Sequence, residues 1–186
     1  KGLLFHIATV LVFNRLNIVD ANVHTLGDKV FDVFKVLSSG RKPIELGEYY
    51  FVQKQIKEDL LRIFIKKESL TQIYKGRNLP DRPEAGKYKE VKLKHKIIGR
   101  AIKLESHDIL GTFMMMTKVF SELGLEIQRA VLHTHQGTAS NVFYFNPRDM
   151  EQILEKKEKL IEKIQDALGQ LLKAEPIFLE ETAAVI

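Results

Sequence analysis

The chain has 186 residues, of which 45% are hydrophobic and 28% charged, with a formal net charge of +5 and no cysteine. This size and composition allow one or two modest hydrophobic cores, and no run reaches the ~20 apolar residues of a membrane span. The absence of cysteine excludes disulfides and thiolate zinc sites and is typical of a cytoplasmic protein.

Two stretches, residues 2–36 and 111–145, align without a gap when one is shifted by 109 positions. Nine of the 35 aligned pairs are identical, where unrelated chains would give roughly two. Most other pairs exchange one apolar residue for another. A duplicated unit of this size is a small domain, because solenoid repeats are about 20 to 50 residues long.

The first copy is expected to form a helix followed by a hairpin. Apolar residues recur at helical spacing from Leu4 to Leu16. Strand character follows over residues 18–24 and again over 30–36, with a tight turn at Leu26-Gly27-Asp28 between them.

The second copy predicts the same elements and also what precedes them. Its expected elements are a strand at 99–104, a loop at 105–108, a helix at 112–123, and strands at 126–134 and 140–145 that flank a turn at 136–137. The equivalent leading strand of the first copy would lie before Lys1, so we expect the chain to be a piece of a longer protein.

A long helix is expected after each hairpin, over residues 51–75 and 148–173, with Asp149 as the N-cap of the second. Residues 77–86 contain two prolines and indicate a linker. Closing strands are expected at 88–96 and 176–180.

This order of elements, βαββαβ, predicts an α+β fold with two ferredoxin-like units in tandem, the first of them without its leading strand. The expected domains are residues 1–96 and 97–186.

The stretch from Lys1 to Val36 resembles the core of an ACT domain. The resemblance lies in the Gly-Leu-Leu helix start, the Asn-Ile entry to the next strand, the His-Thr strand end and the Asp-Val-Phe strand. The pair of units also resembles the C-terminal tandem ACT region of the bifunctional uridylyltransferase/uridylyl-removing enzymes of bacterial nitrogen control.

The resemblance implies a regulatory module that senses an amino acid, with glutamine suspected, and controls attached catalytic domains. It implies no catalytic residue, cofactor or metal within this chain. The alternative is a free-standing tandem ACT protein that regulates a separate partner enzyme.

The helix starts are the expected ligand site. Gly2 and Gly111 would let a ligand approach the backbone, where the helix N-terminus offers unpaired N–H groups to a carboxylate. Asn17 can hydrogen-bond an amide or an ammonium. The resemblance implies that such turns line an effector site where two units meet. The expected ligand-binding residues are Gly2, Leu3, Asn17, Ile18, Asp108, Gly111, Thr112, Glu126 and Ile127.

The two copies are expected to differ in binding. Asn17 of the first copy aligns with Glu126 of the second. The family's acidic-Arg-Pro-Gly approach to the helix is present as Asp108-Ile109-Leu110-Gly111, without arginine or proline. We therefore expect two unequal sites, one of which is structural. The alternative is that the glycines serve only tight turns and that Asn17 caps a helix end.

Other functions have less support in the sequence. His133 and His135 would face the same side of a strand, but no third ligand type lies nearby to complete a zinc site. An RNA-binding domain has the same strand order, yet the basic-Gly-aromatic-Gly pattern is missing before Phe143 and Phe145. Sheet edges favour a homodimer, and no membrane partner is expected.

Overall fold

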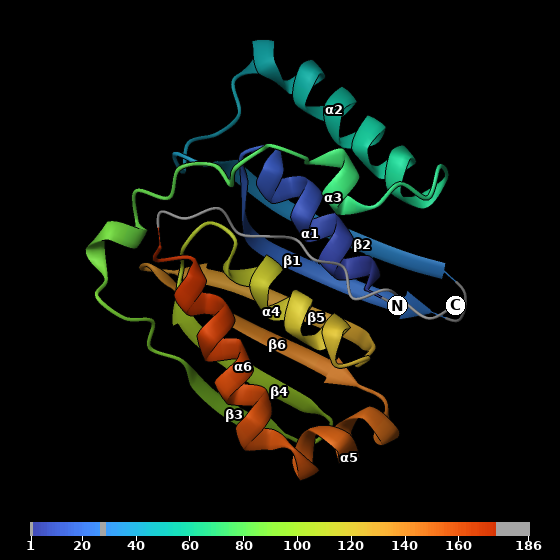
Figure 1. Cartoon of the computed structure of the whole chain (residues 1–186), viewed down its shortest axis with the longest axis vertical. Coiled ribbons are helices and arrows are strands. Elements are labelled where there is room, and N and C mark those ends of the chain that lie inside the picture. Colours follow the sequence, from blue (N-terminus) through green and yellow to red (C-terminus); the bar gives the residue numbers. More distant parts are fainter. Residues whose placement is uncertain (1, 27–28, 174–186) are drawn as a thin grey trace.

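A computed structural model describes residues 2–26 and 29–173. Its strands form one six-stranded antiparallel sheet in the order β2-β1-β5-β6-β4-β3. The helices α1, α4 and α6 lie side by side over one face of this sheet (Figure 1). The strands are β1 (Leu16–Leu26), β2 (Lys29–Ser38), β3 (Lys94–Ile98), β4 (Ala101–His107), β5 (Ile127–His135) and β6 (Thr138–Phe145).

The described helices lie before, between and after pairs of antiparallel strands along the chain. The fold is therefore in the α+β class, as predicted. The helices are α1 (Leu3–Phe13), α2 (Leu46–Phe64), α3 (Leu70–Ile73), α4 (Thr112–Glu122), α5 (Pro147–Glu155) and α6 (Lys157–Gln170), with a short 3₁₀ helix at Ala85–Lys87. The expected tandem of two ferredoxin-like units is not confirmed, because strands of both halves join a single sheet.

The repeat in the sequence is also a repeat in the structure. α1 begins at Leu3 and α4 at its aligned residue Thr112, and each helix leads into an antiparallel hairpin. β1 and β5 pair antiparallel in a register that sets Asn22 opposite Val131, and these two residues are also aligned in the repeat. A local two-fold axis therefore passes between Asn22 and Val131 and relates the two halves.

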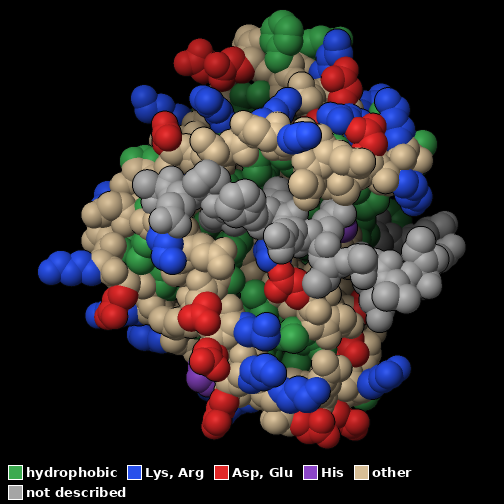
Figure 2. Space-filling view, in the orientation of Figure 1, with side chains coloured by type: hydrophobic (Ala, Val, Ile, Leu, Met, Phe, Trp, Pro, Cys, Tyr) green, Lys and Arg blue, Asp and Glu red, His purple; other side chains and the backbone are tan. Residues whose placement is uncertain are grey.

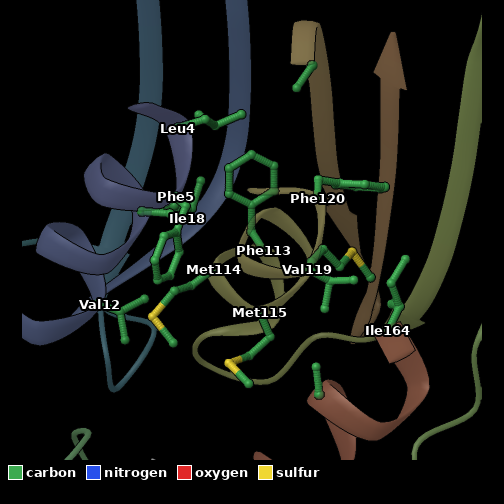
Figure 3. Packing of buried hydrophobic residues seen from close by; sticks show 14 of the residues in the cluster. Leu4, Phe5, Val12, Ile18, Phe113, Met114, Met115, Val119, Phe120 and Ile164 are labelled. Atoms are coloured by element: carbon green, nitrogen blue, oxygen red, sulfur yellow. The ribbon is translucent and has the colours of Figure 1, made fainter. Parts of the chain in front are cut away.

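The hydrophobic core lies between the sheet and the helices, with α4 at its centre. The side chain of Met114 lies beside Val12 of α1 (Figure 3). The ring of Phe120 contacts Phe143 and Phe145 edge-on, at centroid distances of 4.9 and 5.1 Å. Since α1, α6 and the sheet cover α4 on three sides, this helix is apolar around most of its circumference.

The helix expected over residues 51–75 is two helices, so that prediction is wrong. α2 ends at Phe64, Lys67 adopts a left-handed φ of 58°, and Ser69 and Gln72 then form a capping box that starts α3. The buried carboxylate of Asp59 accepts hydrogen bonds of 3.0 Å from both Asn14 and Tyr74. These bonds hold α2 and α3 against α1.

The helix expected over residues 148–173 is also interrupted. α5 and α6 meet at Lys156, whose φ of −117° and ψ of 25° leave the helical region. The N-cap of α5 is Asn146, which accepts a 2.8 Å hydrogen bond from the backbone N–H of Asp149. Asp149 instead accepts a 2.8 Å hydrogen bond from the backbone of Glu126 and ties α5 to the start of β5.

The segment expected to close the first unit pairs with the second half. The predicted strand at 88–96 is shorter and later, at Lys94–Ile98, and it pairs with β4. β4 extends to His107, beyond the predicted end at Leu104, so most of the expected loop at 105–108 is strand. The expected closing strand at 176–180 lies outside the described residues.

Candidate ligand-binding site between the two halves

Each half opens its first helix with a glycine in the left-handed region. Gly2 has a φ of 74° and Gly111 a φ of 97°, and both are N-caps without a side-chain capping bond. Residues with a Cβ avoid this region, so glycine is required by the backbone. At Gly2 the two halves also approach closely, because a Cβ atom there would lie 2.6 Å from the Ser121 hydroxyl oxygen of α4.

A first pocket, here called the Gly2 pocket, lies between the start of α1 and the second half. It has a volume of about 90 Å³. The start of α1 forms one wall, α4 and the start of β5 form another, and β1 and β2 complete it. Its lining residues are Gly2, Leu3, Leu4, Phe5, Val23, Asp32, Thr117, Ser121, Leu125, Glu126 and Ile127.

A second pocket, here called the Gly111 pocket, is related to the first by the local two-fold axis. It is nearly filled, with a volume of about 10 Å³, roughly the space of one water molecule. The Cδ2 atom of Leu171 would lie 3.1 Å from a Cβ atom on Gly111, so the end of α6 crowds this glycine. The lining residues are Val12, Asn17, Ile18, Asp108, Ile109, Gly111, Thr112, Phe113, Met114, Leu132 and Ala139.

The structure brings the nine sequence-predicted site residues into these two pockets. The pairing is crosswise, because the helix start of one half meets the strand start of the other. The Gly2 pocket combines Gly2 and Leu3 with Glu126 and Ile127, and the Gly111 pocket combines Asp108, Gly111 and Thr112 with Asn17 and Ile18. Asn17 lies at the start of β1 and contacts Asp108, so it does not cap α1.

Asp32 of β2 lines the Gly2 pocket and was not among the predicted residues. Burial raises the pKa of its carboxyl group above the ordinary value, and a hydrogen bond with the His24 backbone partly offsets the rise. The strand pattern in the sequence could have identified Asp32. Under strict alternation Asp32 shares the inward face of Phe34 and Val36, where a carboxylate is unusual.

Arg41 pairs with Asp108 of the Gly111 pocket and was also missed. Its guanidinium lies 2.6 Å from the Asp108 carboxylate, donates a 2.6 Å hydrogen bond to the Asp108 backbone carbonyl, and lies 3.4 Å from Glu84. Burial raises the pKa of Asp108, while the positive charge of Arg41 and a hydrogen bond with Asn17 work in the opposite direction. The polar groups of this pocket are thus largely engaged by the chain itself.

Other chemistry finds no support in the described part of the chain. No group of three His, Cys, Asp or Glu side chains is placed there to hold a metal ion. His133 lies with its Nδ1 atom 3.7 Å from an Asp20 carboxylate oxygen, and its ring is nearly parallel to that of His135. Across residues 2–26 and 29–173, no helix has the length and apolarity needed to cross a membrane.

We expect Gly111→Ala to lower the free energy of unfolding by about 1–3 kcal/mol, because alanine is strained at a φ of 97° and its methyl group meets Leu171. Gly169→Ala is the matched control. Gly169 lies within α6 with nothing near its Cβ position, so alanine there should add about 0.5–1 kcal/mol. Urea denaturation measures both; a neutral Gly111→Ala would contradict the assigned backbone strain.

No protein-family model, curated protein or solved structure matches this chain.

Proposed function

We propose that this chain is a tandem ACT-like regulatory region that binds a small amino acid between its two halves, with glutamine as the first candidate. The observation that carries the proposal is the pair of pockets related by the local two-fold axis. Each pocket joins a glycine helix start of one half to the strand start of the other. A ligand there would contact both halves and so couple binding to their relative position.

The strand order supports the tandem ferredoxin-like interpretation. In the second half the order β5-β6-β4-β3 is that of a βαββαβ unit whose fourth position is filled by β3. Because β3 precedes β4 in the chain, the closing strand of the second unit is replaced by a strand from the region that follows the first. We infer two ferredoxin-like units that share strands.

In the proposed function the bound amino acid switches catalytic domains outside this chain. Uridylyltransferase/uridylyl-removing domains attached upstream, acting in the cytoplasm on nitrogen signalling, are the first candidate. A free-standing regulator of a separate partner enzyme is the second. The coding sequence upstream of Lys1 separates them, because only the first contains nucleotidyltransferase and His-Asp phosphohydrolase motifs.

The two pockets support unequal binding. At its strand start the Gly2 pocket has Glu126, which is exposed, while the Gly111 pocket has Asn17, which is buried and contacts Asp108. The Gly2 pocket is also the larger by volume. We therefore propose the Gly2 pocket as the binding site and the Gly111 pocket as structural.

Calorimetric titration with L-glutamine tests this proposal. We expect one glutamine per chain, binding about 5-fold more weakly in Glu126→Gln because a charged hydrogen-bond acceptor is lost. Asn17→Ala, the change at the equivalent position, should alter the affinity less than about 2-fold. L-Glutamate should bind more weakly than glutamine, since the pocket is lined by carboxylates. Absence of glutamine binding at millimolar concentration would contradict the proposal.

RNA binding has weaker support. The aromatic residues Phe143 and Phe145 are buried beneath α4 and cannot stack on a base. Lys and Arg side chains are interspersed with Asp and Glu over the helical face, where no continuous basic surface is seen (Figure 2). In the titration above, single-stranded RNA at low salt serves as the comparison ligand and should give no signal.

The edge of the sheet supports the proposed homodimer. β2 pairs with β1 along one side and with no described strand along the other. Phe31 and Val33 on this edge strand are 63% and 70% exposed. Edge strands with apolar side chains favour pairing with a further strand, so we propose association through β2.

A further inference from the structure

The Gly2 pocket has an uneven charge. In the described part of the chain, its ionisable lining side chains are Asp32 and Glu126, and both are carboxylates. No lysine, arginine or histidine of that part lines the pocket. The start of α1 supplies the opposite polarity, because its first backbone N–H groups have no partner within the helix. One wall of the pocket thus favours an anionic group and another favours a cationic one.

Asp32 is the more buried of the two carboxylates. It pairs across the strands with Val23, which also lines the pocket. Its Oδ1 atom is buried and has no hydrogen-bond partner among the described residues. A buried carboxylate oxygen without a donor costs free energy, and burial accordingly raises the pKa of this group. A ligand that brings N–H donors and a positive charge would remove this cost.

The second half carries no such carboxylate at the aligned position, which is Asn141 in β6. Asn141 is a neutral amide with no exposed surface. The acidic group that does line the Gly111 pocket, Asp108, is already held by Arg41 at 2.6 Å. One carboxylate oxygen of the Gly2 pocket therefore has neither a donor nor a neighbouring cation from the described lining residues, whereas the Asp108 carboxylate of the counterpart faces the Arg41 guanidinium.

We propose that Asp32 binds the ammonium group of the ligand in the Gly2 pocket and so restricts that ligand to primary amines. This inference rests on the proposed function, and it adds the group that is recognised and the residue that recognises it. The ammonium donates to Asp32 from within the pocket, and Glu126 adds negative charge at the exposed side. The ligand's carboxylate faces the backbone N–H groups at the start of α1.

Three ligands separate recognition of the ammonium group from recognition of the carboxylate. L-Glutamine carries both charged groups, glutaramate lacks the ammonium, and 4-aminobutanamide lacks the carboxylate. For the unaltered chain we expect glutaramate to bind about 10- to 100-fold more weakly than glutamine, the effect of losing one charge-assisted hydrogen bond. 4-Aminobutanamide should keep measurable binding, because its ammonium still reaches Asp32.

The variant Asp32→Asn keeps the shape of the side chain and removes its charge. It should weaken glutamine and 4-aminobutanamide by about 10- to 100-fold each and leave glutaramate unchanged. Asp20→Asn is the matched control, since it removes the same charge from an exposed carboxylate on β1 and should change no affinity by more than about 2-fold. Asp32→Ser is the second variant, used if the amide perturbs folding as judged by near-ultraviolet circular dichroism.

The outcomes separate the two proposals. If Asp32→Asn leaves glutamine binding intact, or weakens glutaramate as much as glutamine, the role of Asp32 is overturned while amino-acid binding stands. If 4-aminobutanamide binds in an Asp32-dependent manner and glutamine does not, amino-acid sensing is overturned while amine recognition stands. If none of the three ligands binds, both are overturned.

Discussion

Phe143→Ala should lower the free energy of unfolding by about 3–5 kcal/mol, the usual cost of removing a fully buried phenylalanine. The ring of Phe143 packs between Phe113 and Phe120, at centroid distances of 5.7 and 4.9 Å, and has no exposed surface. Its removal would leave a cavity at the centre of the core. Urea denaturation followed by circular dichroism measures the loss.

The repeat provides a matched control for this prediction. Phe34 aligns with Phe143, but it lies in the edge strand β2 and is only partly buried. Phe34→Ala should therefore cost about 1–2 kcal/mol, in proportion to the smaller apolar area removed from water. Equal losses of unfolding free energy in the two variants would mean that Phe34 and Phe143 are buried to the same degree. That result would contradict the edge position of β2.

Arg41→Ala should cost about 2–3 kcal/mol at pH 7, because it leaves the buried Asp108 carboxylate without its cation. The value lies below that of a fully buried pair, since the Arg41 side chain is 31% exposed and partly screened by water. In an Asp108→Asn background, Arg41→Ala should cost about 1 kcal/mol or less. A thermodynamic cycle over the four proteins isolates the interaction.

The cost of Arg41→Ala should also depend on pH. Burial raises the pKa of Asp108 in the folded state, so ionisation of this group lowers stability as pH rises. Loss of Arg41 raises that pKa further, and the penalty grows across the same interval. Below about pH 3 the carboxyl is largely protonated in both folded and unfolded states, and the variant should approach the stability of the unaltered chain. A penalty independent of pH would contradict the ion pair.

The local structure of each repeat could be read from the sequence because it depends on short-range patterns. Apolar residues at helical spacing gave α1 and α4, and alternation gave the two hairpins, with ends within a few residues of the observed ones. The glycines at the helix starts followed from the same comparison. Gly2 and Gly111 align, and both adopt the left-handed φ that a side chain disfavours.

The strand pairing that connects the two halves could not be predicted from short-range sequence patterns. Pairing of β1 with β5 depends on contacts between edges, which leave little trace in the period of one strand. Continuous apolar stripes also concealed the breaks at Lys67 and Lys156, because both lie at polar positions that suit a helix as well as a turn.

The placement of charged side chains in the two pockets was also beyond short-range prediction. The glycine turns were predicted, whereas Arg41 reaches Asp108 across 67 residues of sequence from a loop with no recognisable motif. Alternation marks Asp32 as an unusual carboxylate on an inward strand face, but its position beside the helix start of its own half and Glu126 of the other depends on the fold. Long-range proximity of charged groups is a property of the fold.

Under the proposed function, the local two-fold axis between Asn22 and Val131 also determines how the chain would respond to a ligand. Separate subunits that meet to form a site must first associate, so their response varies with their own abundance. Here a covalent connection keeps both walls of each pocket at a high effective concentration. Dilution of the protein should therefore leave its ligand affinity unchanged, and the signal would follow the metabolite rather than the amount of receptor.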